Sequence, residues 1–218
     1  MKNILILTAS YGMGHKSVSN AIKEEIDSKN EGFNVQIADI YNITHTSLKD
    51  VGTKFYDNIT ENFPVIYNAL YDIKKYNKNN IIDGIICNSG YKLLYEYIQN
   101  LSPVAVISTF PLCACIMSKI KGKYNFPAKH ITIITDIADS WEWVYPNTDL
   151  YFVPSVEIKT SLVYKGISND IIKVTGIPVA SKFLSTKKDG DSTASSPTDK
   201  YLLMVGSGLS EKELESSF

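Results

Sequence analysis

Short apolar runs alternate with segments of helical periodicity along most of the chain, and this alternation is the strongest constraint on the fold. We expect strands at residues 3–8, 33–38, 104–108, 130–135, 150–153 and 172–175. We expect helices at residues 17–26, 92–101, 112–121 and 156–165, and mostly helical structure over 44–80. Residues 81–86 fit either a helix start or a short strand. Strands that alternate with helices predict an α/β fold with a doubly wound, mostly parallel sheet.

The first strand leads into a glycine-rich turn that ends at a histidine. Gly12 and Gly14 allow a tight turn and a close approach of the backbone to a ligand, with Met13 between them. The free N–H groups at the start of the next helix favour an anion or a polar oxygen. His15 follows directly, and histidine is the side chain best suited to proton transfer near neutral pH. Alternatively, this is an ordinary strand–turn–helix corner whose histidine caps or packs.

Other polar residues follow the remaining strands. Asp39, Thr109 and Asp136 each come at or just after the carboxyl end of an expected strand. In a parallel sheet these ends share one edge, and ligands bind there. Asp136 therefore either orients His15 or binds a hydroxyl, or else it is a turn or N-cap residue. For Asp39 the turn interpretation is the stronger one.

Composition excludes several classes. The net charge of −1 provides no field to attract nucleic acid, so we expect no nucleic-acid partner. No apolar run approaches the roughly 18 residues of a membrane-spanning helix. The three cysteines, at 87, 113 and 115, lie in apolar segments, so we expect neither a disulfide framework nor a metal site, and a cytoplasmic setting fits.

The composition changes after residue 183. Residues 184–200 are almost free of apolar side chains, which is typical of a linker. Residues 201–218 then repeat the pattern of strand, glycine turn and helix start. We expect one complete domain over 1–183, a linker over 184–200, and over 201–218 the beginning of an incomplete second domain.

Several blocks together resemble the family of monogalactosyldiacylglycerol synthases and processive diacylglycerol glucosyltransferases. The blocks occur in the family's order: residues 5–17, 133–136, 149–153, 166–167, 172–178 and Phe183. The resemblance implies the N-terminal, acceptor-binding half of a GT-B fold, in which two Rossmann-like domains face each other across a cleft. It implies that residues 201–218 begin the C-terminal donor domain.

The same resemblance implies an activity. The family transfers a sugar from a UDP-sugar to diacylglycerol, with the donor held mostly by the C-terminal domain. It implies His15 as the base for the acceptor hydroxyl, no cofactor beyond the UDP-sugar donor, and a cytoplasmic protein peripheral on the inner face of the cell membrane. From this we expect His15 and Asp136 to be catalytic. The expected substrate-binding residues are Gly12, Met13, Gly14, Thr109 and Trp143.

The chain departs from the family pattern at two places. Phe110-Pro111 stands where the family commonly has His-Pro. Residues 140–145 keep Trp143 but lack both histidines that flank it in the family. Ser140 and Tyr145 stand at the two flanking positions, so the resemblance does not carry a role in proton transfer or in binding a lipid headgroup over to them.

The segment from Thr44 to Tyr76 combines aromatic side chains with lysines, as interfacial helices do. We expect it to face the membrane, or else to pack as an amphipathic helix on the sheet. The expected lipid-facing residues are Phe55, Tyr56, Phe63, Tyr67 and Tyr71.

Two functions remain open. The first is an enzyme of glycolipid synthesis, of which this chain is the acceptor half and whose donor domain is separate or missing. The second is a truncated, non-catalytic module that binds lipid or a partner. A dinucleotide-binding oxidoreductase is a weaker alternative, because the first loop lacks a complete G-x-G-x-x-G.

Overall fold

The computed structural model describes residues 1–10, 13–44, 81–137 and 139–183. The chain divides into one compact unit over Met1–Ser181 and a second over Lys182–Phe218. Gly12, the expected membrane-facing residues and the expected linker and second domain lie outside the described residues.

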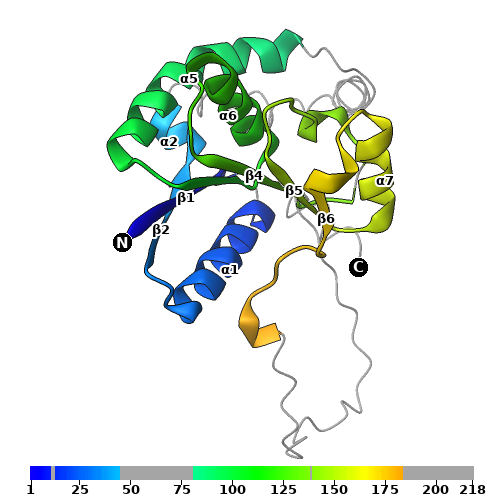
Figure 1. Ribbon diagram of the computed structural model, residues 1–218, viewed down its shortest axis with the longest axis horizontal. Helices are drawn as coiled ribbons and strands as arrows, with labels where there is room; N and C mark the ends of the chain where they lie inside the picture. Colours follow the sequence, from blue (N-terminus) through cyan, green and yellow to red (C-terminus); the bar gives the residue numbers. More distant parts are fainter. Residues whose placement is uncertain (11–12, 45–80, 138, 184–218) are drawn as a thin grey trace, which may run out of the picture. The chain divides into compact units, whose positions relative to one another are not determined.

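The described strands form one parallel sheet in the order β2-β1-β3-β4-β5-β6 (Figure 1). Their bounds are β1 Lys2–Thr8, β2 Phe33–Asp39, β3 Ala105–Ser108, β4 Lys129–Ile133, β5 Leu150–Val153 and β6 Ile172–Val174. All five neighbouring pairs run parallel; β1, for example, pairs Ile4 with Val35 on one side and with Ala105 on the other. The predicted Rossmann-like α/β fold is confirmed.

The described helices connect these strands. Their bounds are α1 Gly14–Lys29, α2 Ile40–Thr44, α5 Ile81–Leu101, α6 Pro111–Tyr124 and α7 Val156–Tyr164, with short 3₁₀ turns at Trp141–Trp143, Asn169–Ile171 and Ser181–Phe183. Pro111 occupies the first turn of α6, where its missing N–H costs nothing. Gly166, at φ +93°, follows α7, at a position where glycine commonly ends a helix.

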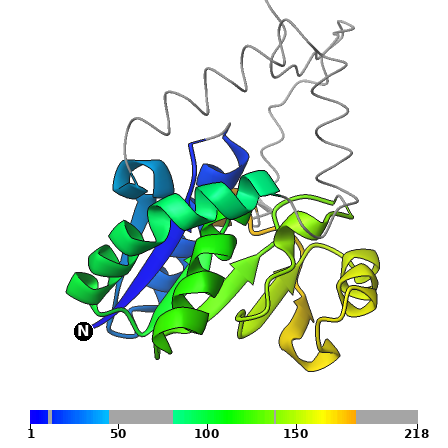
Figure 2. The same ribbon diagram turned by 90° about the horizontal axis from the view of Figure 1, so that it is seen from above.

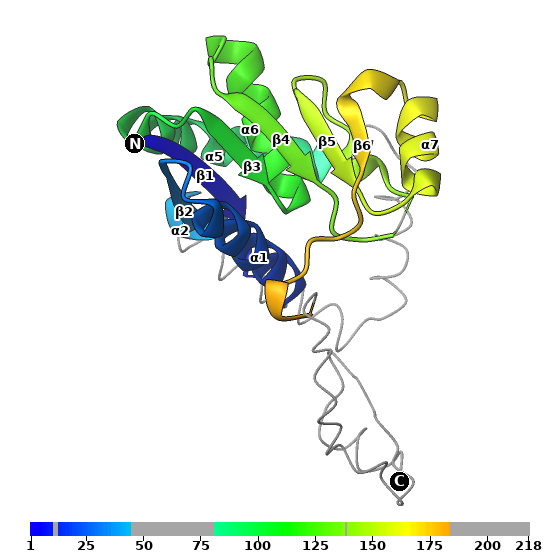
Figure 3. The same ribbon diagram turned by 60° about the horizontal axis from the view of Figure 1, so that its bottom comes forward.

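Alternate side chains of β1 enter two different cores. Leu5 and Leu7 pack in the cluster that α5 and α6 cover, whereas Ile4 and Ile6 pack with Val18 of α1. Figures 1 and 3 show α1 on one face of the sheet and α5 and α6 on the other. Figure 2 shows α5 and α6 side by side. A strand covered on both faces must be apolar throughout, which explains the continuous apolar run in the sequence.

Helices α1, α5 and α6 are longer than the sequence indicated. The open question over residues 81–86 resolves as helix, because α5 runs without a break from Ile81 to Leu101. Helix α1 begins at Gly14 rather than at Ser17, so Gly14 and His15 belong to its first turn. The expectation that Gly14 makes a tight turn is therefore wrong, and its backbone does not have a positive φ.

The cysteines differ from expectation. Cys87 of α5 and Cys115 of α6 form a disulfide, with their Cα atoms 6.2 Å apart, and Cys113 is free and buried. The two partners are 28 residues apart in the chain and become neighbours only when α5 and α6 pack together. Their spacing in the sequence could not indicate this.

Within the described residues, no helix combines the length and the apolar character needed to cross a bilayer.

Candidate functional site

The candidate site lies where the order of the sheet reverses. Strand β1 has β2 on one side and β3 on the other, so the connections that leave β1 and β3 diverge at their carboxyl ends. In open parallel sheets this reversal leaves a crevice in which ligands bind. His15 follows β1 and Thr109 follows β3, so both lie at this position.

Two oxygen atoms hold one nitrogen of the His15 ring. The carbonyl oxygen of Thr109 and the hydroxyl oxygen of Thr135 each lie 2.9 Å from Nδ1. Thr135 comes two residues after the end of β4, so the imidazole is bound from the ends of two different strands.

These contacts determine the tautomer. A carbonyl oxygen can only accept a hydrogen bond, so Nδ1 must carry the proton that points at Thr109. In a neutral imidazole the other nitrogen, Nε2, then has a free lone pair. His15 is therefore oriented as a base that can accept a proton at Nε2.

The surroundings of His15 keep the ring neutral. The pKa of His15 lies below its usual value of 6.5, because burial of the ring disfavours the charged form more than the Thr109 carbonyl and the charge of Asp136 favour it. Phe110 lies edge-on to the imidazole, with ring centroids 5.0 Å apart. At pH 7 the ring is thus mostly in the form that accepts a proton.

Thr109 is a structural support of the base. Its side chain is completely buried, and its hydroxyl contacts Ser19 at 2.9 Å and the carbonyl of Leu7 at 3.2 Å. Its backbone N–H also bonds to Leu7. The Thr109 side chain cannot reach a substrate, and what it contributes is a fixed carbonyl for His15.

Asp136 and Trp143 are bonded to each other. The indole N–H of Trp143 donates to a carboxylate oxygen of Asp136 at 3.1 Å. Only 1% of Trp143 is exposed, and its ring packs with Tyr151 and Val153. The indole therefore fixes the position of Asp136. Because Trp143 is buried, its ring does not contact a substrate, contrary to the expectation from the sequence. Asp136 acts on His15 through charge, and the Nδ1 hydrogen bonds of His15 run to the two threonines.

The residues before His15 face open space. Met13 is the N-cap of α1 and is 73% exposed. A Cβ built on Gly14 would have no heavy atom within 4 Å. Neither residue is required by packing within the described part of the chain.

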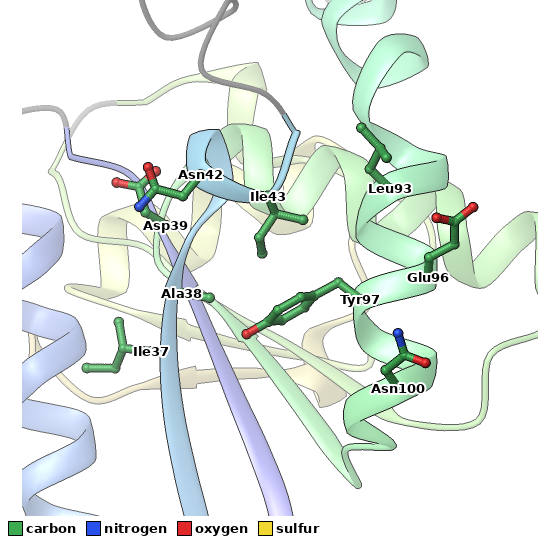
Figure 4. Close-up of a pocket in the computed structure, with 9 residues that line it drawn as sticks. All are labelled: Ile37, Ala38, Asp39, Asn42, Ile43, Leu93, Glu96, Tyr97 and Asn100. Atoms are coloured by element: carbon green, nitrogen blue, oxygen red, sulfur yellow. The ribbon is translucent and has the colours of Figure 1, made fainter.

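A cavity of about 560 Å³ lies between β2, α2 and α5 (Figure 4). Asp39, Asn42 and Tyr97 contribute polar atoms to its lining. Asp39 is already bound, because it accepts hydrogen bonds from the Ser10 hydroxyl and from the Tyr41 backbone N–H. Its second bond is the turn interaction expected from the sequence.

No group of three or more His, Cys, Asp and Glu side chains forms a metal site in the part of the chain that the structure describes. The chemistry available at the site is that of one neutral imidazole, one carboxylate and two threonines.

Sequence reasoning missed two members of the site. The sequence predicts Thr135 only as part of a strand, and Phe110 differs from the family pattern without pointing to a role. The signal for Thr135 was present, because it stands beside Asp136 at a strand end. The ring contact of Phe110 had no signal in the sequence.

Comparison with known proteins gives consistent matches. A family model described as monogalactosyldiacylglycerol (MGDG) synthase matches residues 15–179. A processive diacylglycerol beta-glucosyltransferase of Staphylococcus carnosus (strain TM300) is 30% identical over 183 residues, which cover 84% of this chain and 46% of the relative. The protein of the same name from Staphylococcus haemolyticus (strain JCSC1435) is 29% identical over 186 residues. The chain thus matches less than half the length of these relatives.

Among solved structures, the lipopolysaccharide outer core galactosyltransferase WaaB in its apo form is similar, with a TM-score of 0.50 and 18% identity. The match covers 80% of this chain and 45% of that one. At this identity the likeness concerns the fold alone, and it agrees with the fold class expected for one half of a GT-B glycosyltransferase.

Proposed function

Because the chain belongs to the monogalactosyldiacylglycerol synthase family, we propose that it provides the acceptor side of a glycosyltransferase that makes glycolipid. The acceptor is diacylglycerol, and the donor is a UDP-hexose. Residues 1–183 are the acceptor-binding domain in this proposal, and the protein works peripherally on the inner face of the cell membrane.

The orientation of His15 is the observation that carries the proposal. Its Nδ1–H is committed to Thr109, which leaves Nε2 free as a base beside the carboxyl ends of the strands. Because its pKa is lowered, the ring is neutral near pH 7 and can take the proton that the acceptor hydroxyl must lose.

The proposed step is a single displacement. The free hydroxyl oxygen of diacylglycerol attacks the anomeric carbon of the hexose, and its proton passes to Nε2 of His15. The bond from the anomeric carbon to the diphosphate breaks, and the electron pair leaves with UDP. Backbone N–H groups at the start of α1 lie at the same edge of the sheet and suit an anion such as the diphosphate.

The test is a transfer assay on the chain supplied together with a donor half, with UDP-glucose or UDP-galactose and vesicles that contain diacylglycerol. The His15→Gln variant keeps a side chain of similar size but cannot act as the base, so we expect transfer to fall by roughly 100- to 10,000-fold. Asn20→Ala, an exposed change on the same helix, serves as the matched control and should transfer normally.

Three results are informative. Near-normal transfer by His15→Gln would remove His15 from the mechanism. Vesicle binding by the unmodified protein without any transfer would favour the second function, a lipid-binding module. If the protein neither bound the vesicles nor transferred sugar, the proposal would be contradicted.

The pH profile provides an independent check. The base must be neutral to accept a proton, and the pKa of His15 is lowered by burial. We expect kcat/KM to rise with pH through a single acid limb whose midpoint lies below about 6.5, and then to level off. A midpoint above that value would mean that another group limits the reaction.

A further inference from the structure

The Thr135 hydroxyl group does not donate its proton to His15. Its Oγ1 lies 2.9 Å from Nδ1 of His15, which is its hydrogen-bond partner among the described residues. The side chain is half-buried and lies two residues after the end of β4, at the carboxyl edge of the sheet where the crevice lies.

The direction of the bond between these two groups follows from Thr109. Because the Thr109 carbonyl requires a proton on Nδ1, the same N–H is shared between that carbonyl and Oγ1, as in other three-centre hydrogen bonds. Thr135 is therefore the acceptor of this bond. Its own O–H remains available to donate to another group.

The neighbours of Thr135 restrict what that group can be. Asp136 follows directly, and its negative charge opposes an anionic oxygen such as that of a diphosphate. Along the chain, Met13 lies two residues before His15 and Ile137 directly follows Asp136; they are 73% and 72% exposed. A carboxylate and two exposed apolar side chains suit a neutral oxygen that is attached to hydrocarbon.

We propose that the Thr135 hydroxyl donates a hydrogen bond to an ester carbonyl oxygen of the acceptor lipid while Nε2 of His15 binds the lipid's free hydroxyl. This assignment rests on the proposed function and makes its substrate class more specific. One contact is made by Nε2 of the imidazole and the other by a hydroxyl that lies 2.9 Å from Nδ1 of the same ring, so both fall within the span of a single glycerol headgroup.

The experiment compares two lipids that differ only at the proposed contact. Dioctanoylglycerol has ester carbonyls, and the corresponding dioctyl ether has none. Binding of each lipid to the chain is followed by tryptophan fluorescence, since the Trp143 indole is bonded to Asp136. The variants are Thr135→Val, which removes the hydroxyl, and Thr135→Ser, which retains it. Thr160→Val, an exposed threonine of α7, is the matched control.

We expect Thr135→Val to weaken binding of the ester lipid by roughly 5- to 10-fold, the effect of one neutral hydrogen bond, and to leave binding of the ether unchanged. Thr135→Ser and Thr160→Val should bind both lipids as the unmodified chain does. Equal weakening for both lipids would show a purely structural role, and no weakening for the ester would exclude the contact. Either result would overturn this inference and leave the proposed function intact. Failure of the unmodified chain to bind either lipid would overturn both.

Discussion

At the scale of single residues, the site depends on where one proton lies. Nδ1 of His15 carries it because the Thr109 carbonyl is 2.9 Å away, and Nε2 is then the basic atom. Burial lowers the pKa of the ring, so the base needs no deprotonation step near pH 7.

Gly14 gives a test of whether a ligand approaches the start of α1. A Cβ at this position meets no protein atom within 4 Å, and alanine favours a helix over glycine by up to about 1 kcal/mol. We expect Gly14→Ala to keep or slightly raise the free energy of unfolding in urea, and to lower sugar transfer by at least about 10-fold, since the methyl group would occupy the space of the ligand. Transfer equal to that of Asn20→Ala would show that no ligand uses this space.

The sequence could name His15 and Asp136, because both stand at strand ends in a predicted parallel sheet. It could not show which atoms they use. The bond between Trp143 and Asp136, and the two bonds to Nδ1, depend on loop conformations that have no periodic pattern. The roles of these residues in catalysis stay predictions until variants are measured.

At the scale of elements, helices α2 and α5 pack so closely at Gly90 that there is no room for a larger residue. Gly90 of α5 faces Thr44 at the end of α2, and a Cβ there would lie 2.7 Å from Thr44 Cγ2. Thr44 is buried, and its hydroxyl bonds to the Ile40 carbonyl at 2.8 Å, so it has little freedom to move away.

We therefore expect Gly90→Ala to lower the free energy of unfolding by roughly 1 to 3 kcal/mol, the usual effect of overpacking, despite the better helix propensity of alanine. Thr44→Ser removes the Cγ2 atom, so the double variant should recover most of the loss that Gly90→Ala causes alone. A urea-unfolding double-mutant cycle measures this coupling. A Gly90→Ala chain more stable than the unmodified one would contradict the predicted contact.

Strand β1 was predictable because it is buried on both faces and is apolar along most of its length, whereas the edge strands β2 and β6 are only partly buried and include polar residues. The bounds of the helices were less so. Helix α1 includes Gly14, whose low propensity suggested a later start, and α5 continues through residues whose apolar run fitted a strand equally well. The disulfide between Cys87 and Cys115 depends on the packing of α5 against α6, and local sequence carries no information about it.

At the scale of the whole molecule, a buried histidine makes stability depend on pH. His130 is completely buried in β4, with Ser108 Oγ 3.1 Å from its Nε2 and the Asn147 carbonyl 3.4 Å from Nδ1. Burial lowers the pKa of His130 to about 4. The folded chain therefore resists a proton that the unfolded chain accepts at pH values below about 6.5.

The unfolded state binds more protons than the folded state between these two pKa values, so stability must fall as the pH falls through this range. We expect His130 to reduce the free energy of unfolding by about 2 to 3 kcal/mol between about pH 7.5 and about pH 4.5. Urea unfolding of the unmodified chain and of His130→Gln at both pH values isolates the effect, because glutamine does not titrate. The same pH dependence in both proteins would show that His130 is not its source.

The partners of His15 have a consequence for how the protein is made. Thr109 and Thr135 lie 94 and 120 residues further along the chain than the histidine they hold. Contacts of such long range form late, since the entropy of closing the intervening chain must be overcome first. During synthesis on the ribosome, the imidazole is made 120 residues before Thr135 and has no fixed orientation until Thr135 has emerged and β1, β3 and β4 have paired. A nascent or misfolded chain can contain His15 and still lack the oriented base.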